Sequence, residues 1–187
     1  MPRNLSHRQI IETAVVLAQS EGLDAITLSR LAKELEIRTA SLYNHIDGIE
    51  SLKCDLAIFG MDKLLDEIKI GVIGKSGPEA LITVMFVYRS FAKLNSGIYD
   101  LIFRVYENQQ QLDQQRSELI RLLSLILKPF NLSWDDEIHL IRGLRSFIHG
   151  FVSLELNQGF RMEVTIEESY SRFANMIVRT AIALGNK

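Results

Sequence analysis

Apolar residues recur every three or four positions along almost the whole chain, and this spacing restricts its possible folds more than any other feature. Only three prolines interrupt the spacing, and the alternating runs of β-branched residues that form strands are almost absent. A chain of 187 residues with 47% hydrophobic composition can bury one good core, or a small head joined to a larger body. The pattern therefore predicts an all-α protein.

Capping signals divide the chain into about nine expected helices. Ser6 followed by Gln9 predicts a capping box at the start of the first helix, and Gly22 predicts its end. Thr27 predicts the cap of a second, short helix, and residues 37–39 form a turn before a third helix of about two turns. The other expected helices cover approximately residues 48–68, 78–94, 98–106, 110–128, 134–158 and 166–184.

The second and third expected helices, with the tight turn between them, predict a helix-turn-helix. Residues 35–46 read LEIRTASLYNHI and present small, hydroxyl-bearing and aromatic side chains instead of a continuous apolar face. A helix pressed against DNA needs small residues for close approach, and hydroxyl, amide and guanidinium groups for phosphates and base edges. This composition therefore predicts that the third helix enters a major groove.

Residues 7–54 resemble the DNA-binding head of the TetR family of transcriptional regulators. The segment that carries the resemblance is TLSRLAKELEIRTASLYNHI, followed by an acidic-glycine turn and Leu52. Residues 147–151, with Glu155 and Gly159-Phe160, are similar to a regulatory-body subtype in which Trp-His-Gly is usual, although Ile148 stands where tryptophan would be. The resemblance implies a helix-turn-helix head over residues 1–52 and a larger helical bundle over residues 53–187 that binds ligand and dimerises.

The resemblance also implies which residues contact DNA. Those expected at phosphates are Thr27, Ser41, Tyr43 and His45, those expected at bases are Arg38, Thr39 and Asn44, and Ala40 would allow close approach. Arg3 would reach the DNA backbone or minor groove from the arm before Ser6. Many relatives carry a lysine where this chain has Ile49, so the amide groups near Gly48 and the charge of Lys53 are expected to face the phosphate instead.

The charge balance restricts how the head can bind DNA. The chain has a formal net charge of -2, and residues 1–54 hold six Lys or Arg side chains against seven acidic ones. We therefore expect weak non-specific binding, a shallow salt dependence and reliance on dimeric readout of spacing. The same balance leaves open a second reading, in which the chain is a helical interaction adaptor that has lost DNA binding.

Two further sets of residues are expected in the body. The resemblance implies an effector cavity bordered by some of Phe59, Tyr88, Arg89, Tyr99, Phe103, Tyr106, Phe147 and His149. Apolar stripes on the last two helices predict a two-fold four-helix dimer interface that includes Ile141, Leu144, Ile148, Phe173, Ile177 and Ala181. Burial in the core of a single subunit is the alternative explanation for every one of these side chains.

No pattern in the sequence indicates catalysis, a cofactor or a metal. Residues 71–76 hold Gly-Lys-Ser, but the glycine that a phosphate-binding loop requires is replaced by Lys69. His139 and His149 lie ten residues apart, which is not the spacing that aims two ligands at one metal from a helix. Cys54 is the single cysteine, so no internal disulfide can form. No leader or bilayer-spanning apolar run is evident, so we expect a soluble cytoplasmic protein without a membrane partner.

Together these observations predict a ligand-responsive transcriptional regulator and not an enzyme. We expect a repressor that binds a near-palindromic operator in double-stranded DNA as a homodimer and is released by a small-molecule effector.

Overall fold

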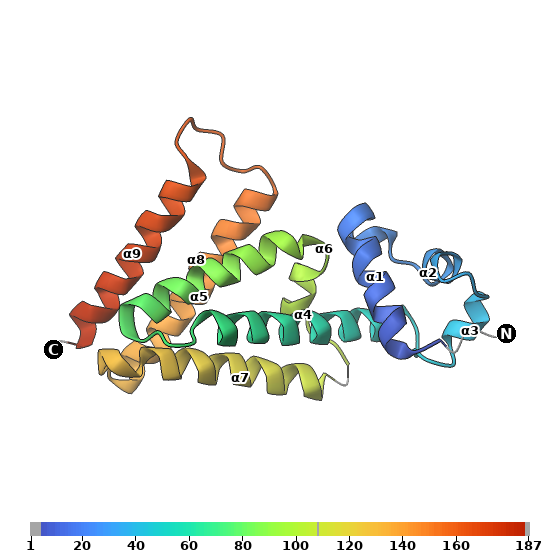
Figure 1. The fold of residues 1–187 in the computed structure, drawn as a ribbon, viewed down its shortest axis with the longest axis horizontal. Helices are drawn as coiled ribbons and strands as arrows, with labels where there is room; N and C mark the ends of the chain where they lie inside the picture. Colours follow the sequence, from blue (N-terminus) through green and yellow to red (C-terminus); the bar gives the residue numbers. More distant parts are fainter. Residues whose placement is uncertain (1–4, 108, 186–187) are drawn as a thin grey trace. The chain divides into compact units, whose positions relative to one another are not determined.

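The computed structural model describes residues 5–107 and 109–185, and all regular secondary structure within these residues is helical (Figure 1). The all-α prediction is therefore confirmed. The α-helices are α1 (His7–Glu21), α2 (Leu28–Glu34), α3 (Thr39–Leu42), α4 (Ile49–Gly71), α5 (Gly77–Leu94), α6 (Ser96–Tyr99), α7 (Gln110–Leu127), α8 (Trp134–Leu156) and α9 (Ile166–Gly185). Short 3-10 turns lie between some of these helices: η1 (Leu23–Ala25), η2 (Asp100–Phe103) and η3 (Lys128–Phe130).

The chain forms two compact units built from alternating segments of the sequence. Unit 1 contains residues 1–63 and 95–115, and unit 2 contains residues 64–94 and 116–187. Helices α4 and α7 each contribute residues to both units. This division differs from a single boundary between residues 52 and 53, because α6 and η2 belong to the same unit as the first three helices.

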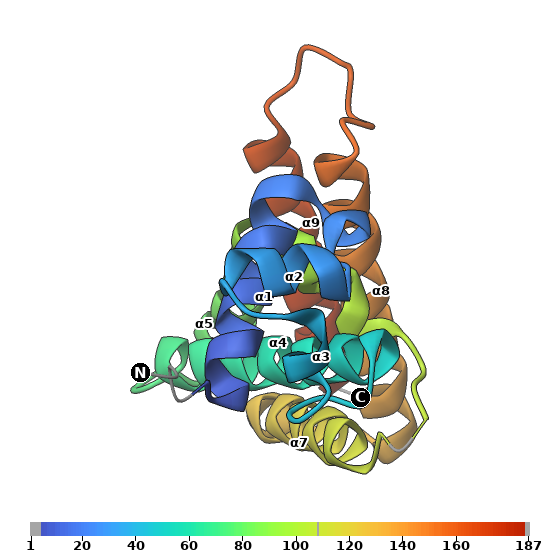
Figure 2. The same cartoon turned by 90° about the vertical axis from the view of Figure 1, so that its right-hand side faces the viewer.

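The first three helices of unit 1 enclose a small core (Figure 2). Ser6 and Gln9 form the expected capping box of α1, and the Thr27 hydroxyl accepts a hydrogen bond from the backbone N–H of Arg30 to cap α2. Leu31 and Leu42 are fully buried, and Ile46 is buried beside them. Burial of these three side chains stabilises the packing of α3 against α2, because it removes their apolar area from water.

Helix α3 is shorter than the two turns predicted. Only residues 39–42 are α-helical, and residues 43–45 continue as a turn in which the N–H groups of His45 and Ile46 both bond to the carbonyl of Leu42. The helix has no side-chain N-cap, since Arg38 occupies the capping position. Without such a cap, this short helix is less stabilised than α1 and α2, whose side-chain caps are in place.

Helix α6 packs against α1 at unusually short range. A Cβ atom added to Gly97 would lie 2.2 Å from the carbonyl oxygen of Ala18, so only glycine allows the two backbones to approach this closely. The sequence predicted one helix over residues 98–106. The structure instead divides the segment into α6 and the 3-10 turn η2, and the chain becomes extended at Arg104.

Unit 2 is held together by α5, α8 and α9, which pack against one another. Arg89 of α5 is 5% exposed and donates hydrogen bonds to both carboxylate oxygens of Glu155 in α8, at 2.8 Å each, and to Glu167 in α9 at 2.7 Å. The Tyr170 hydroxyl donates to the carbonyl of Met85 at 2.6 Å. These interactions connect the C-terminal end of α8 and the N-terminal end of α9 to α5.

Among the helices of the described residues, none combines the length and the apolar character that crossing a membrane requires.

Candidate nucleic-acid interface

Residues 38–45 form the exposed edge of the helix-turn-helix in unit 1. The side chains of Arg38, Ala40, Tyr43, Asn44 and His45 are exposed, with Tyr43 at 59%, while those of Thr39 and Ser41 are half-buried. Leu42 is the one residue of this stretch that turns into the core. The fold therefore brings all seven expected contact residues of α3 and its flanks onto one accessible surface.

The polar groups of this surface are available for contacts with another molecule. Within the part of the chain that the structure describes, no hydrogen bond, ion pair or ring contact engages the side chains of Arg38, Tyr43, Asn44 or His45. They offer a guanidinium fork, a phenol, an amide and an imidazole next to the small side chain of Ala40. This combination suits phosphate oxygens and base edges better than an apolar partner.

Thr27 has two roles that its hydroxyl can fill together. Its oxygen accepts the 3.1 Å hydrogen bond from the backbone of Arg30, while the O–H itself remains free to donate. The side chain is exposed at the N-terminus of α2. A phosphate oxygen is therefore a suitable acceptor for the remaining donor.

Gly48 and Lys53 lie at the start of α4. Gly48 has a φ of 124°, a backbone conformation that favours glycine, and it directly precedes the first helical residue. The Nζ atom of Lys53 forms a 2.7 Å ion pair with Glu50, a competitor that the sequence analysis did not anticipate for its phosphate contact. Arg3 lies outside the described residues.

Most of the other cations of the head are also paired within the head. Arg8 bonds to Glu12, and Arg30 bonds to both Glu21 and Glu34. The hydrogen bonds that Arg30 donates to these two glutamates raise its pKa above the ordinary value. Lys33 and Arg38 are the cations of residues 5–54 that form no ion pair within the described chain. The unpaired positive charge of these residues therefore lies on Lys33 of α2 and on Arg38 at the beginning of α3.

Helices α1 and α4 are joined by a contact that sequence reasoning missed. The Nε2 atom of His7 lies 2.9 Å from a carboxylate oxygen of Asp55. The two residues are 48 positions apart, so no local pattern could have indicated the pair.

The residues expected to border an effector cavity fall into both units. Unit 1 holds Phe59, Tyr99, Phe103 and Tyr106, and unit 2 holds Tyr88, Arg89, Phe147 and His149. Tyr99 is buried and meets Phe103 edge to face, with ring centroids 5.2 Å apart. Tyr106 lines a polar cavity of about 710 Å³ that also contains four carboxylates, Asp47, Glu50, Asp55 and Glu107.

Two of these residues have structural contacts that account for their burial. Tyr88 is buried in the core of unit 2. The Arg89 guanidinium is occupied by its two glutamates and lies 4.6 Å from the centroid of the Tyr170 ring. Burial alone lowers the pKa of Arg89, but the hydrogen bonds that it donates to Glu155 and Glu167 outweigh this effect and raise the pKa overall. Arg89 is thus held as a structural cation.

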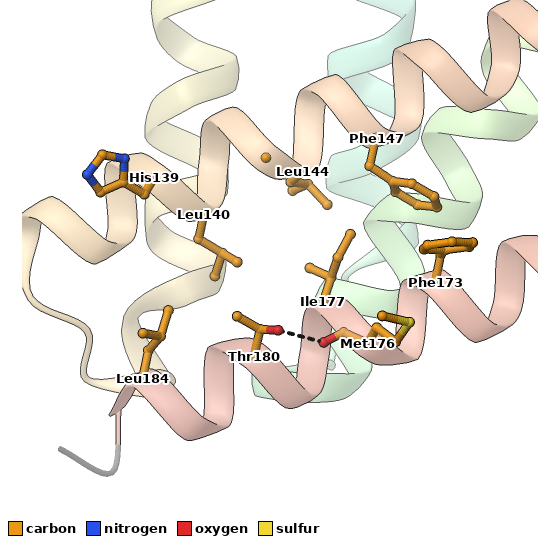
Figure 3. Close-up of a pocket in the computed structure, with 10 residues that line it drawn as sticks. His139, Leu140, Leu144, Phe147, Phe173, Met176, Ile177, Thr180 and Leu184 are labelled. Atoms are coloured by element: carbon orange, nitrogen blue, oxygen red, sulfur yellow. Dashed lines mark hydrogen bonds between the residues drawn. The ribbon is translucent and has the colours of Figure 1, made fainter.

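A groove of about 520 Å³ runs between α8 and α9 of unit 2 (Figure 3). Phe147 and Phe173 face each other across it at one end, and Leu140 and Leu184 close on it at the other. Phe173 is 48% exposed and Met176 is 56% exposed, so a large apolar area remains open to solvent in the single chain. Gly143 and Gly150 of α8 have no neighbour within 4 Å of a Cβ position, so another helix could approach there closely.

Three of the expected dimer residues, Leu144, Phe173 and Ile177, line this groove. The other three, Ile141, Ile148 and Ala181, do not line it and are at most 3% exposed in the single chain, so they leave almost no surface to bury against a partner. Gly143, Phe147, Met176 and Thr180 also line the groove, and the sequence analysis did not name them for this role. In the sequence, these groove residues could have been found at the outer edge of each apolar stripe, on the side that does not face the core.

Among the residues that the structure describes, no group of three or more His, Cys, Asp or Glu side chains is arranged to hold a metal ion.

Comparison with known proteins gives three consistent matches. Residues 81–177 match the family model of the tetracyclin repressor-like C-terminal domain. The chain is 30% identical over 184 residues to the uncharacterised HTH-type transcriptional regulator YobS of Bacillus subtilis (strain 168), and the match covers 98% of this chain and 95% of the relative. The structure of apo ActR from Streptomyces coelicolor has the same fold, with a TM-score of 0.72 and 16% identity over 100% of this chain and 99% of that one. ActR in complex with (S)-DNPA gives a TM-score of 0.68 at 17% identity, covering 96% and 98% of the two chains.

Proposed function

The chain belongs to the TetR family of helix-turn-helix transcriptional regulators, and from this premise we propose that it is a repressor that binds a near-palindromic operator as a homodimer and is released by a small-molecule effector. The family and the relatives are regulators of transcription and not enzymes. Because a protein of this kind acts on chromosomal DNA, we place it in the cytoplasm.

The observation that carries the proposal is the unengaged polar surface of residues 38–45. The exposed side chains of Arg38, Asn44 and His45 form no hydrogen bond or ion pair within the described structure, so their donors and acceptors can contact another molecule. In the proposed complex Arg38 and Asn44 read base edges in the major groove, and Tyr43 and His45 bind phosphates. Thr39, Ser41, Thr27 and the N-terminus of α4 at Gly48 supply the remaining contacts.

The open groove between α8 and α9 supports the homodimer. Two copies related by a two-fold axis would bury Phe173, Met176 and Phe147 in a four-helix bundle, and Gly143 would allow close contact between the two α8 helices. Such a dimer must present its two α3 helices about 34 to 36 Å apart to meet successive major grooves. An operator with two-fold symmetry follows from that geometry.

The effector part of the proposal is supported by the regulatory body. Its family model is that of the tetracyclin repressor-like C-terminal domain, and ActR, which shares the fold, has been solved in complex with a small molecule, (S)-DNPA. An effector that prefers a dimer with its heads at another spacing would shift the population away from the DNA-binding state.

Gel-shift measurements with the DNA that flanks the protein's own coding region test this function. Tyr43→Ala should weaken binding to every DNA fragment, whereas Asn44→Ala should also reduce discrimination between sequences, by about 1 to 3 kcal/mol per base contact. Trp134→Ala removes an exposed aromatic side chain from unit 2 and serves as the control. Unchanged affinity and specificity in both Tyr43→Ala and Asn44→Ala would contradict the proposed interface.

A second candidate function is a helical interaction adaptor without DNA binding. The internal ion pairs of Arg8, Arg30 and Lys53 favour it, because they reduce the charge that the head offers to phosphates. If no fragment of the flanking DNA is bound by the wild-type dimer at low salt, the adaptor becomes the better explanation.

A further inference from the structure

Residues 5–54 contain two lysine or arginine side chains that form no ion pair within the described chain, Lys33 and Arg38. Lys33 lies in the last turn of α2, and Arg38 directly precedes the first residue of α3. When a helix-turn-helix binds DNA, its first helix crosses the sugar-phosphate backbone, and the N-terminal residues of its second helix reach the base edges. The two cations are therefore expected to meet different parts of a duplex.

The backbone is fixed on both sides of Arg38, while its side chain is not. The N–H of Ile37 donates to the carbonyl of Ala32 at 3.0 Å, and the carbonyl of Arg38 accepts a 2.8 Å hydrogen bond from the N–H of Ser41. The Arg38 side chain is exposed and forms no hydrogen bond within the described residues. The next exposed side chain, that of Ala40, is a methyl group and leaves room for close approach. Only the side chain of Arg38 must be ordered on binding, which favours a directional contact.

Guanine is the base that suits the Arg38 guanidinium. This group carries five N–H donors in a rigid fork and no acceptor. In the major groove, guanine presents two neighbouring acceptors, N7 and O6, whereas adenine and cytosine each present a donor and thymine presents a single acceptor beside its methyl group. Two parallel hydrogen bonds from one guanidinium to one base edge can therefore form only with guanine.

We propose that Arg38 reads a guanine, so that each half of the operator carries a G·C pair in the major groove at the start of α3. In an operator with two-fold symmetry, this guanine occurs once in each half-site, at symmetric positions. The inference names the base for one contact and so rests on the proposed function. Lys33, a compact charge on the first helix of the motif, contributes at most a phosphate contact without sequence preference.

Selection from duplex DNA with a randomised core, using the full-length wild type, tests the assignment. We expect the bound fraction to be enriched in one guanine at symmetric positions of two half-sites. Replacing that guanine by 7-deazaguanine removes only its N7 acceptor. The affinity of the wild type should then fall at least about tenfold over the two half-sites, or about 1.4 kcal/mol, and that of Arg38→Ala by less than about threefold.

Two further variants separate base reading from general electrostatic attraction. Arg38→Gln should change the selected base at these positions from guanine to adenine, because a glutamine amide pairs with the N6 and N7 atoms of adenine. A merely structural role of Arg38 would not produce this change. Lys33→Gln is the matched control, since it removes the other unpaired charge of the head. It should weaken binding to all sequences alike and keep the preference for guanine.

Failure of this inference can be separated from failure of the proposed function. If the wild type enriches a sequence but is insensitive to 7-deazaguanine, or if Arg38→Ala selects the same guanine, the inference is overturned and the regulator function stands. The 7-deazaguanine measurement on the wild type decides the case in which Arg38→Ala binds too weakly for selection. If the wild type enriches no sequence at all, both the proposed function and the inference fail.

Discussion

At the scale of single residues, the cations of the head differ in how available they are. Arg38 has no partner in the described chain, whereas Lys53 is paired with Glu50 and Arg30 with two glutamates. An ion pair that must be broken before a phosphate can bind reduces both affinity and the number of counter-ions released. The head should therefore depend on Arg38 more than its six basic residues suggest.

Glu50→Gln should release Lys53 for DNA. We expect tighter operator binding and a salt dependence that is steeper by about 0.9 for each additional phosphate contact, or about 1.8 for a dimer. Fluorescence anisotropy over a series of salt concentrations gives the slope of log K against log salt concentration. Glu34→Gln is the control, because Arg30 keeps Glu21 as its second partner. An unchanged slope in Glu50→Gln would show that Lys53 faces no phosphate.

At the scale of helices, local signals and long-range contacts differ in how far they could be predicted. Ser6 and Thr27 each cap the helix that the sequence assigned to them, because a cap involves residues only three positions apart. The stacking of α6 on α1 through Gly97 depends on a backbone far along the chain, and no local pattern encodes it. Arg89 is separated from Glu155 by 66 positions and from Glu167 by 78, so no local pattern could indicate that these two carboxylates hold its guanidinium.

The exposed polar surface of α3 was predictable for the same reason that its core was. Leu42 and Ile46 turn inward because they are apolar, and the intervening polar residues are then left outside. The open groove was predicted only in outline. Helical spacing identifies an apolar stripe, but the division of that stripe between the core and the surface depends on which neighbouring helix covers it.

Glu155→Gln should weaken the ion pairs that Arg89 forms with Glu155 and Glu167 and that hold the ends of α8 and α9. Burial raises the pKa of Glu155, but hydrogen bonds from Arg89 and Lys93 outweigh it, so that pKa lies below the ordinary glutamate value. A carboxylate with a lowered pKa stabilises the fold above the pKa of the unfolded chain, and the contribution is lost as pH falls through the folded value. The variant should therefore lose about 2 kcal/mol of unfolding free energy at pH 7, and this loss should shrink as pH falls below the ordinary glutamate pKa towards the folded value.

Urea denaturation at several pH values measures this difference. Glu168→Gln, which removes an exposed partner of Arg172, should change the unfolding free energy by less than about 1 kcal/mol at every pH. A loss of unfolding free energy in Glu155→Gln that stays constant down to pH 3 would mean that the charge of Glu155 contributes nothing to its interaction with Arg89.

At the scale of the whole molecule, the groove between α8 and α9 determines the expected assembly. It leaves Phe173 and Met176 exposed in a single chain, and a two-fold partner is the proposed cover. The same pairing would provide the second recognition surface that a near-palindromic operator requires. Dimerisation and DNA binding are therefore expected to be lost together.

Met176→Glu should convert the dimer into a monomer, because it places a charge in the centre of the proposed bundle while leaving the subunit core intact. Sedimentation velocity at micromolar concentration measures the change, and operator affinity should fall by at least about tenfold, or about 1.4 kcal/mol. Met162→Glu adds the same charge to the exposed loop between α8 and α9 and should leave both properties unchanged. A wild type that sediments as a monomer would refute the two-fold assembly.

The interleaving of the two units also has a practical consequence for chimeric regulators. Residues 95–115 return to unit 1 after the chain has already entered unit 2. No single cut therefore separates unit 1, which carries the proposed DNA-binding surface, from unit 2. Replacing unit 1 by that of another regulator, while keeping unit 2, would require three junctions, after residues 63, 94 and 115. Recombination at one point would leave Ala18 without the glycine-containing helix that packs on it.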